Sequence, residues 1–224
     1  MALGKTGFNV VIHCRRSLAE ARALKAGLEK LGVKARVVRG SLDDEKAVAQ
    51  MWYEAAKAAG RIEVLVNCAA VFNKDTVGTM SGAAITGEFW PNLFAPMLLT
   101  KYFAAQSLER GDIVNLLDRR IASHDPECVP YLLSKKALAE FTKTSALALA
   151  PRIRVNGVAP GPVLAPPGKP AGSLRDRAGK IPLLETVAPG EIADAVIALL
   201  NMPATTGQIV FVDGGQHLLG SHDQ

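Results

Sequence analysis

Short runs of apolar, often β-branched residues alternate along the chain with longer alanine-rich segments whose apolar positions recur at the helical period. The short runs predict strands at 8–14, 33–40, 62–70, 111–118, 152–160 and 207–215. The longer segments predict helices at 17–31, 42–60, 130–150 and 189–200. A further helix is expected within 83–108, beginning near Glu88 or Pro91. Ser17, with Glu20 three residues later, predicts a capped start for the first helix.

This rhythm of strand, helix and strand is typical of a doubly wound, Rossmann-like α/β fold with a parallel sheet and right-handed crossovers. We expect a single domain over residues 1–224. The irregular stretch 160–182 holds six prolines and is too long for a simple connection, so we expect a substrate loop region at 160–188. Ligands of such sheets bind outside the carboxyl ends of the strands.

Charge and composition narrow the classes of partner. The net charge is +5, but the basic residues are scattered, and only 5% of residues are aromatic. A platform for stacking nucleic-acid bases is therefore excluded, and a nucleic-acid-binding protein is disfavoured. The positive balance instead favours anionic small molecules, phosphates in particular.

The cysteines and histidines argue against a disulfide scaffold and a metal site. Three cysteines form no C-x-x-C pair, and four histidines form no H-x-H or H-E-x-x-H pattern. These features indicate a reducing compartment and no bound metal. No stretch approaches eighteen uninterrupted apolar residues, so we expect a cytoplasmic protein with no membrane partner.

Tyr131 and Lys135 stand four positions apart at the start of the helix predicted at 130–150, so they share a helix face. A lysine cation at ~4 Å, with an effective dielectric of about 20, stabilises a phenolate by roughly 4 kcal/mol. Such a tyrosine could give a proton to a carbonyl or imine that is being reduced. From spacing alone the alternative is stronger: Tyr131 packs and Lys135 extends into water.

The context of this pair resembles the short-chain dehydrogenase/reductase family over nearly the whole chain. The resemblance lies in Tyr131-Leu-Leu-Ser-Lys135, "VNCAA" (66–70), Asn92 in "PNLFAP", "RIRVNGVAPG" (152–161) and "TGQIVFVDGG" (206–215). These motifs occur in the family's order and at predicted strand ends. Together they imply an NAD(P)-dependent oxidoreductase that transfers hydride.

The resemblance also implies roles for individual residues. Tyr131 would be the proton donor, Lys135 would lower its pKa and hold the nicotinamide ribose, and Asn92 would support a water relay to the lysine. For Asn92, capping of its own helix is the alternative. Five residues would contact the cofactor along its nicotinamide or ribose: Asn67, Ala69, Pro160, Gly161 and Val163.

Asp118 stands thirteen positions before Tyr131, where the family usually has a serine that polarises the substrate carbonyl. Either the site is lost, or the substrate is one that donates hydrogen bonds to a carboxylate, as a nitrogen heterocycle does. Pteridine reductases of this family resemble the chain in this aspartate and in Phe72, which would stack on the pterin ring. The plainer alternatives are a solvated turn residue beside Arg119 and Arg120, and a core or lid aromatic.

The end of the first predicted strand bears on cofactor choice. His13, Arg15, Arg16 and Ser17 follow there without an acid, which favours the phosphate of NADP over the free ribose hydroxyls of NAD. Two solvated arginines in a loop are the alternative. Ser41 and Leu42 occupy the place where the family usually has Asp-Leu against the adenine.

One family feature is absent: the sequence shows no opening strand followed by a glycine-rich phosphate turn. Gly4 and Gly7 follow no strand. The chain therefore resembles the family without its first βα unit, either because its start is assigned late or because it is truncated. A hydrophobic slot should then lie open beside the strands at 8–14 and 62–67, and cofactor affinity should fall.

Two functions remain after these exclusions. The first is an NADPH-dependent reductase of a pterin-like or other small carbonyl or imine substrate. The second is a catalytically impaired member of the same fold with a binding or assembly role. Relatives are often tetramers built on the two long helices, so we expect a homo-oligomer, a tetramer or dimer.

Overall fold

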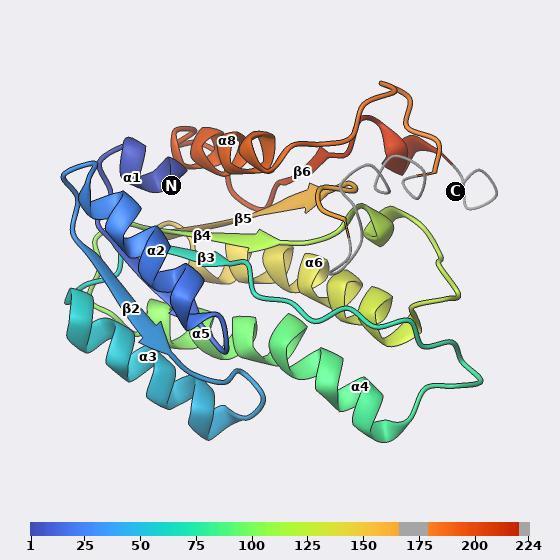
Figure 1. Cartoon of the computed structure of the whole chain (residues 1–224), viewed down its shortest axis with the longest axis horizontal. Coiled ribbons are helices and arrows are strands. Elements are labelled where there is room, and N and C mark those ends of the chain that lie inside the picture. Colours follow the sequence, from blue (N-terminus) through green and yellow to red (C-terminus); the bar gives the residue numbers. More distant parts are fainter. Residues whose placement is uncertain (166–178, 220–224) are drawn as a thin grey trace.

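The computed structural model describes residues 1–165 and 179–219. Part of the expected substrate loop region, 166–178, lies outside the described residues. The chain forms an α/β fold in three layers (Figure 1). The long helices α5 and α6 cover one side of the strands, whereas α8 covers the other. The predicted doubly wound parallel fold is thereby confirmed.

Six strands carry the fold among the described residues, and every pairing between them is parallel. They are β1 (Val10–Cys14), β2 (Ala35–Arg39), β3 (Val64–Asn67), β4 (Gly111–Leu116), β5 (Ile153–Pro160) and β6 (Ile209–Val212). β1 pairs with β2, and a separate sheet has the order β3-β4-β5-β6. The strands β4 and β5 are almost wholly buried, as expected for strands covered on both faces.

Helices follow the strands as the pattern predicts. They are α1 (Ala2–Lys5), α2 (Leu18–Glu29), α3 (Glu45–Ala59), α4 (Gly82–Phe89), α5 (Ala95–Ala104), α6 (Val129–Leu149) and α8 (Pro189–Leu200). Short helical turns are η1 (Trp90–Phe94), η2 (Arg119–Ala122) and η3 (Gln216–Leu218). Asp44 caps α3 by accepting from the backbone N–H of Ala47.

The helix expected to begin near Glu88 or Pro91 begins earlier, and this boundary prediction was wrong. Ser81 caps α4 by accepting from the N–H of Ala84, a signal more local than the proline. Pro91 is accommodated inside the π-turn η1, which joins α4 to α5 without ending the helix. Ser17 does occupy the N-cap of α2, but its side chain makes no capping hydrogen bond.

A deep cleft of about 730 Å³ separates the two sheets. Its walls come from β1 and β3, and its floor includes Met51, Ala55 and Leu99 of α3 and α5. Within the described residues, β1 pairs only with β2 and β3 only with β4, so each leaves one backbone edge toward the cleft. This is the open slot that the sequence predicts beside the strands at 8–14 and 62–67.

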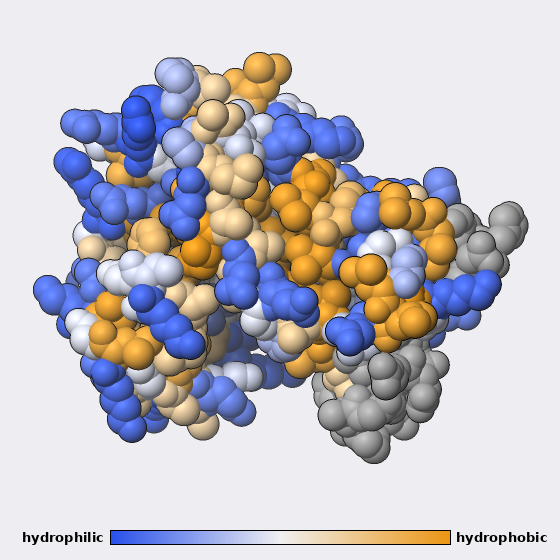
Figure 2. All heavy atoms as spheres, turned by 90° about the horizontal axis from the view of Figure 1, so that it is seen from above, coloured by the Kyte–Doolittle hydropathy of each residue, from blue (hydrophilic) through white to orange (hydrophobic). Residues whose placement is uncertain are grey.

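The core is built from apolar clusters on both sides of the sheets. Phe103, Ile113 and Val155 pack together where α5 meets β4 and β5. Hydrophobic side chains also reach the surface between hydrophilic ones, as Figure 2 shows from above. Within residues 1–165 and 179–219, no helix has the length and hydropathy needed to cross a membrane.

Candidate active site

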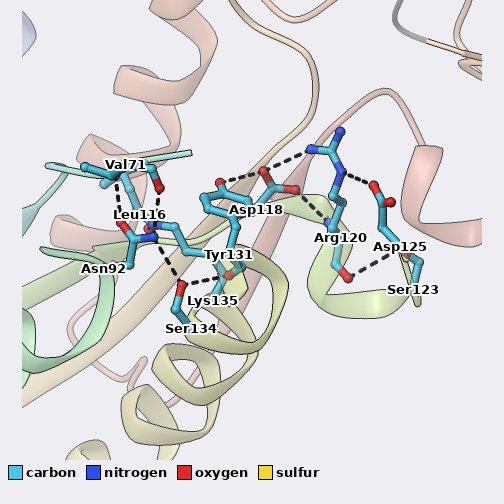
Figure 3. A network of polar contacts seen from close by, with 10 residues as sticks. All are labelled: Val71, Asn92, Leu116, Asp118, Arg120, Ser123, Asp125, Tyr131, Ser134 and Lys135. Atoms are coloured by element: carbon cyan, nitrogen blue, oxygen red, sulfur yellow. Dashed lines mark hydrogen bonds and ion pairs between the residues drawn. The ribbon is translucent and has the colours of Figure 1, made fainter. Parts of the chain in front are cut away.

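Tyr131 lies in the first turn of α6 and is buried, with only 6% of its surface exposed. Its hydroxyl donates a hydrogen bond of 2.8 Å to Oδ2 of Asp118, the residue two positions beyond β4 (Figure 3). Burial, and then the negative charge of Asp118, raise the pKa of Tyr131 above its ordinary value. The phenol therefore stays protonated at neutral pH and is a donor.

Lys135 is one helical turn after Tyr131 and is 3% exposed. Its Nζ donates to the backbone carbonyl of Leu116 at 2.8 Å and lies 6.0 Å from the centre of the Tyr131 ring. Burial lowers the pKa of Lys135 to about 8, although the charges of Asp118 and Cys68 oppose this.

The expected lowering of the tyrosine pKa by this lysine does not occur in the structure. The ammonium is turned toward the end of β4, whereas the phenol is hydrogen-bonded to a carboxylate. A carboxylate that accepts from the phenol disfavours the phenolate, and burial does the same, so together they exceed the opposing charge of Arg120.

Arg120 links Asp118 to a second acid, Asp125. Its backbone N–H donates to Oδ1 of Asp118 at 2.8 Å, and its Nη1 lies 3.4 Å from Oδ2. Its Nε donates to Oδ2 of Asp125 at 2.9 Å. Figure 3 shows the resulting chain from Tyr131 through Asp118 and Arg120 to Asp125.

Phe72 stands beside this chain and is 46% exposed. Its ring meets that of Tyr131 edge-on, with centroids 4.7 Å apart. The guanidinium of Arg120 lies 5.5 Å from the Phe72 centroid. The structure therefore brings Asp118, Tyr131 and Phe72 together, as a ring-binding site requires.

Asn92 is fully buried in η1 and holds the segment before Phe72. Its amide accepts from the N–H of Val71 at 2.8 Å and donates to the carbonyl of Val71 at 2.9 Å. It also donates to Oγ of Ser134 at 3.1 Å. Asn92 does not cap its own helix, and its contact with Val71 positions the neighbouring Phe72. Its part in a water relay stays a prediction.

An arginine-rich hollow of about 450 Å³ lies at the carboxyl ends of β1 and β2. Its lining is Arg15, Arg16, Arg39, Gly40 and Ser41. Arg15 pairs with Asp43, and Nε of Arg39 donates to the carbonyl of Arg15 at 3.1 Å. The hydroxyl of Ser41 is buried here, and none of the residues that the structure describes forms a hydrogen bond with it. Guanidinium donors around an unsatisfied hydroxyl fit an anionic group.

The other residues predicted to hold a cofactor fall into two places. The first group lines the cleft between the sheets: His13, Leu42, Asn67 and Ala69. Leu42 belongs to the core there, and Asn67 donates to the side chain of Asn115 at 2.8 Å. The second group, Pro160, Gly161 and Val163, marks the end of β5 and the turn after it. Ser17 begins α2.

Gly161 is required by close packing. A Cβ added there would come within 2.8 Å of the Cα of Asp213, the residue after β6. The loops that follow β5 and β6 therefore touch at this point. Residues 1–165 and 179–219 contain no group of three potential metal ligands.

Sequence reasoning missed two residues of the site. From the sequence, Arg120 is expected only as a neighbour of a solvated Asp118, and Arg39 is not among the predicted site residues. Arg39 ends the strand next to the one that leads to Arg15, so parallel pairing brings the two together. In this pairing Cys14 lies opposite Arg39. The order of the predicted strands could have indicated that the two strand ends are neighbours.

Comparison with known families extends over almost the whole chain. A family model described as "Enoyl-(Acyl carrier protein) reductase" matches residues 1–217. The chain is 31% identical over 261 aligned positions to Pteridine reductase 1 of Leishmania tarentolae, covering 97% of this chain and 90% of that protein.

Two further matches differ in how much of the relative they cover. The chain is 32% identical over 169 residues to Glucose and ribitol dehydrogenase homolog 2 of Arabidopsis thaliana, covering 72% of this chain but only 58% of that protein. The crystal structure of FolM alternative dihydrofolate reductase 1 from Brucella canis, complexed with NADP, superposes with a TM-score of 0.89 and 35% identity. That match covers 97% of this chain and 87% of the other.

Proposed function

Because the chain belongs to the short-chain dehydrogenase/reductase family of NAD(P)-dependent oxidoreductases, we propose that it is an NADPH-dependent reductase of a pterin-like substrate or another small carbonyl or imine compound. The observation that carries the proposal is the 2.8 Å hydrogen bond between the Tyr131 hydroxyl and the Asp118 carboxylate, beside the exposed ring of Phe72. A serine at position 118 would suit a plain carbonyl; a carboxylate suits a substrate with N–H donors.

NADP is the cofactor that the residues fit. The arginine-rich hollow at Arg15, Arg16 and Arg39 offers guanidinium groups for the additional phosphate, and Ser41 supplies an unsatisfied hydroxyl. The relative from Brucella canis was crystallised with NADP. When bound, the cofactor supplies the hydride that reduces the substrate.

Residues of this chain bind the substrate and supply the proton. Phe72 offers one ring face for stacking with a flat heterocycle. Oδ1 of Asp118 accepts one hydrogen bond, from Arg120, and has room for one more from a substrate N–H. As a carbon–nitrogen double bond accepts hydride at carbon, its nitrogen takes the Tyr131 proton. The Lys135 ammonium, 6.0 Å from the centre of the Tyr131 ring, attracts the negative charge that the phenolate then carries.

The choice of NADPH over NADH can be tested at Arg16. Arg16→Gln should raise KM for NADPH by about tenfold while KM for NADH stays unchanged, because only NADPH loses a charged hydrogen bond. Steady-state kinetics with each cofactor measure the effect. Arg22→Gln, a change of an exposed arginine on α2, is the matched control. Equal effects on both cofactors would contradict the assignment.

Activity should depend on pH through Lys135, whose pKa is lowered to about 8. Below that pH the lysine carries its charge and stabilises the Tyr131 phenolate that the reaction leaves; above it the charge is lost. We therefore expect kcat/KM to fall as the pH rises through about 8. A profile of kcat/KM that stays flat from about pH 7 to about pH 9 would show that the lysine charge is not needed.

The proposal as a whole is tested by following NADPH oxidation with dihydrobiopterin, dihydrofolate, and simple quinones and ketones. We expect turnover of at least one dihydropteridine, faster than that of the plain ketones. No turnover with any compound, together with no change in NADPH fluorescence on mixing, would refute the enzyme proposal.

A second candidate function is a catalytically impaired subunit with a binding or assembly role. The observation that favours it is the cleft of about 730 Å³, which reaches His13, Asn67 and Ala69 and so opens the cofactor side of the sheet. An impaired subunit would leave NADPH fluorescence unchanged, whereas the reductase would alter it.

The last part of the proposal concerns the assembly of the chain with other copies of itself. Large hydrophobic side chains are exposed on the two helices expected to pair with other subunits: Met97 at 40%, Leu133 at 51% and Leu147 at 84%. They support a homo-oligomer, a dimer or tetramer. Sedimentation would measure its mass.

A further inference from the structure

Arg120 contacts both of the acids that it links, Asp118 and Asp125. Its backbone and its guanidinium both reach Asp118, and Nε reaches Asp125. Its side chain is 26% exposed, and those of Asp118 and Asp125 are 16% and 23% exposed. An ion pair that is mostly shielded from water resists screening and fixes geometry better than a surface pair.

The orientation of Asp118 depends on these contacts. Its Oδ1 is held by the Arg120 N–H, and its Oδ2 is shared between the Tyr131 hydroxyl and the Arg120 guanidinium. Because both oxygens already accept hydrogen bonds, the Asp118 carboxylate cannot turn without breaking one of them. The one acceptor position left on Oδ1 therefore has a fixed direction.

Asp125 holds Arg120 from the other side. Its Oδ1 accepts from the N–H of Glu127 at 2.9 Å, so the acid is itself anchored to the chain before α6. Burial alone would lower the pKa of Arg120, but Asp118, Cys128 and Asp125 raise it, so the guanidinium keeps its charge. Ser123 adds a contact from its Oγ to the Arg120 carbonyl at 3.3 Å.

The same guanidinium lies against Phe72, 5.5 Å from the ring centroid. A planar cation over a ring restricts that ring, and the edge contact with Tyr131 restricts it from another direction. Arg120 thus touches both the acceptor and the ring that a flat heterocycle would meet.

From this geometry we infer that Arg120 is a positioning residue of the reductase site, which holds Asp118 in hydrogen bond with Tyr131 and braces Phe72 for a substrate that is a flat heterocycle with N–H donors. The inference rests on the proposed function, because it specifies how that site selects its substrate. Arg120 acts through Asp118 and Phe72 and takes no proton itself.

The test is steady-state kinetics of Arg120→Gln with dihydrobiopterin and with a simple quinone. Loss of the fixed carboxylate should lower kcat/KM for dihydrobiopterin by about tenfold to a hundredfold, with little change for the quinone or in KM for NADPH. A purely structural residue would affect both substrates alike.

Three further variants keep the result interpretable. Arg120→Lys retains the charge but not the planar fork, so it should recover only part of the rate. Asp125→Asn should give a smaller loss of the same kind. Lys143→Gln, which removes an exposed cation on α6, should behave as wild type. Thermal unfolding shows whether each variant is folded.

The possible failures can be told apart. Wild-type turnover with no selective loss in folded Arg120→Gln and Arg120→Lys would overturn the inference about Arg120 and leave the proposed function standing. A wild-type protein that reduces neither the dihydropteridines nor the quinones and ketones, and leaves the fluorescence of NADPH unchanged, would overturn both.

Discussion

Replacing Tyr131 by Phe is expected to lower kcat by roughly 10²- to 10⁴-fold, the usual contribution of a positioned general acid. The change removes only the hydroxyl, whose hydrogen bond to Asp118 is 2.8 Å long, and keeps the ring contact with Phe72. NADPH binding should remain close to that of wild type. The measurement is kcat with saturating NADPH, with cofactor binding followed by fluorescence.

The matched control for this change is Tyr53→Phe, since Tyr53 is 59% exposed on α3. It should leave kcat unchanged. A kcat for Tyr131→Phe within a factor of about two of wild type would show that the proton comes from another group. Loss of NADPH binding in the same variant would instead indicate a structural defect.

Replacing Asp118 by Ser should separate the two classes of substrate. The carboxylate accepts from substrate N–H groups, whereas a serine hydroxyl can donate to a carbonyl oxygen. We expect kcat/KM for dihydrobiopterin to fall by about a hundredfold or more, because a buried hydrogen bond to a charged group is lost together with the partner of Tyr131. Simple ketones should be much less affected or reduced faster.

The ratio of the two specificity constants measures this effect. Asp194→Asn, which removes an exposed acid on α8, controls for the change of charge and should alter neither constant. An equal loss for pterins and ketones would contradict the role of Asp118 in substrate choice. Such a result would leave it only as the residue that caps η2.

Much of this fold could be predicted from the pattern of the chain because its elements are long or strongly periodic. The strand at 111–118 and the helix at 130–150 are examples, and they carry Asp118 and Tyr131 to the same end of the sheet. The start of α4 could not be predicted, since Ser81 gave a weaker signal than Pro91, and the π-turn that absorbs this proline has no sequence pattern.

The site was predictable in its members but not in its electrostatics. Spacing placed Lys135 beside Tyr131, but it could not show that Nζ turns to the Leu116 carbonyl. Nor could it show that Arg120 would reach both Asp118 and Asp125, because these contacts depend on the short turn η2 after β4. The pKa of Tyr131 is raised by burial and by Asp118, so the direction of its shift could not be predicted from the sequence.

The cleft between the two sheets lies beside residues that are predicted to hold the cofactor. In the described part of the chain β1 and β3 belong to different sheets, and the cleft of about 730 Å³ lies between them. The arginine-rich hollow lies at the carboxyl ends of β1 and β2, and its guanidinium groups suit a phosphate.

The central claim, that this chain reduces a dihydropteridine with NADPH, is tested most directly by measuring NADPH consumed and tetrahydropteridine formed in one reaction of the wild-type protein. The account predicts that the two amounts rise together in equal proportion and that both are lost in Tyr131→Phe. Consumption of NADPH without the reduced pteridine, or neither reaction at saturating NADPH, would contradict it.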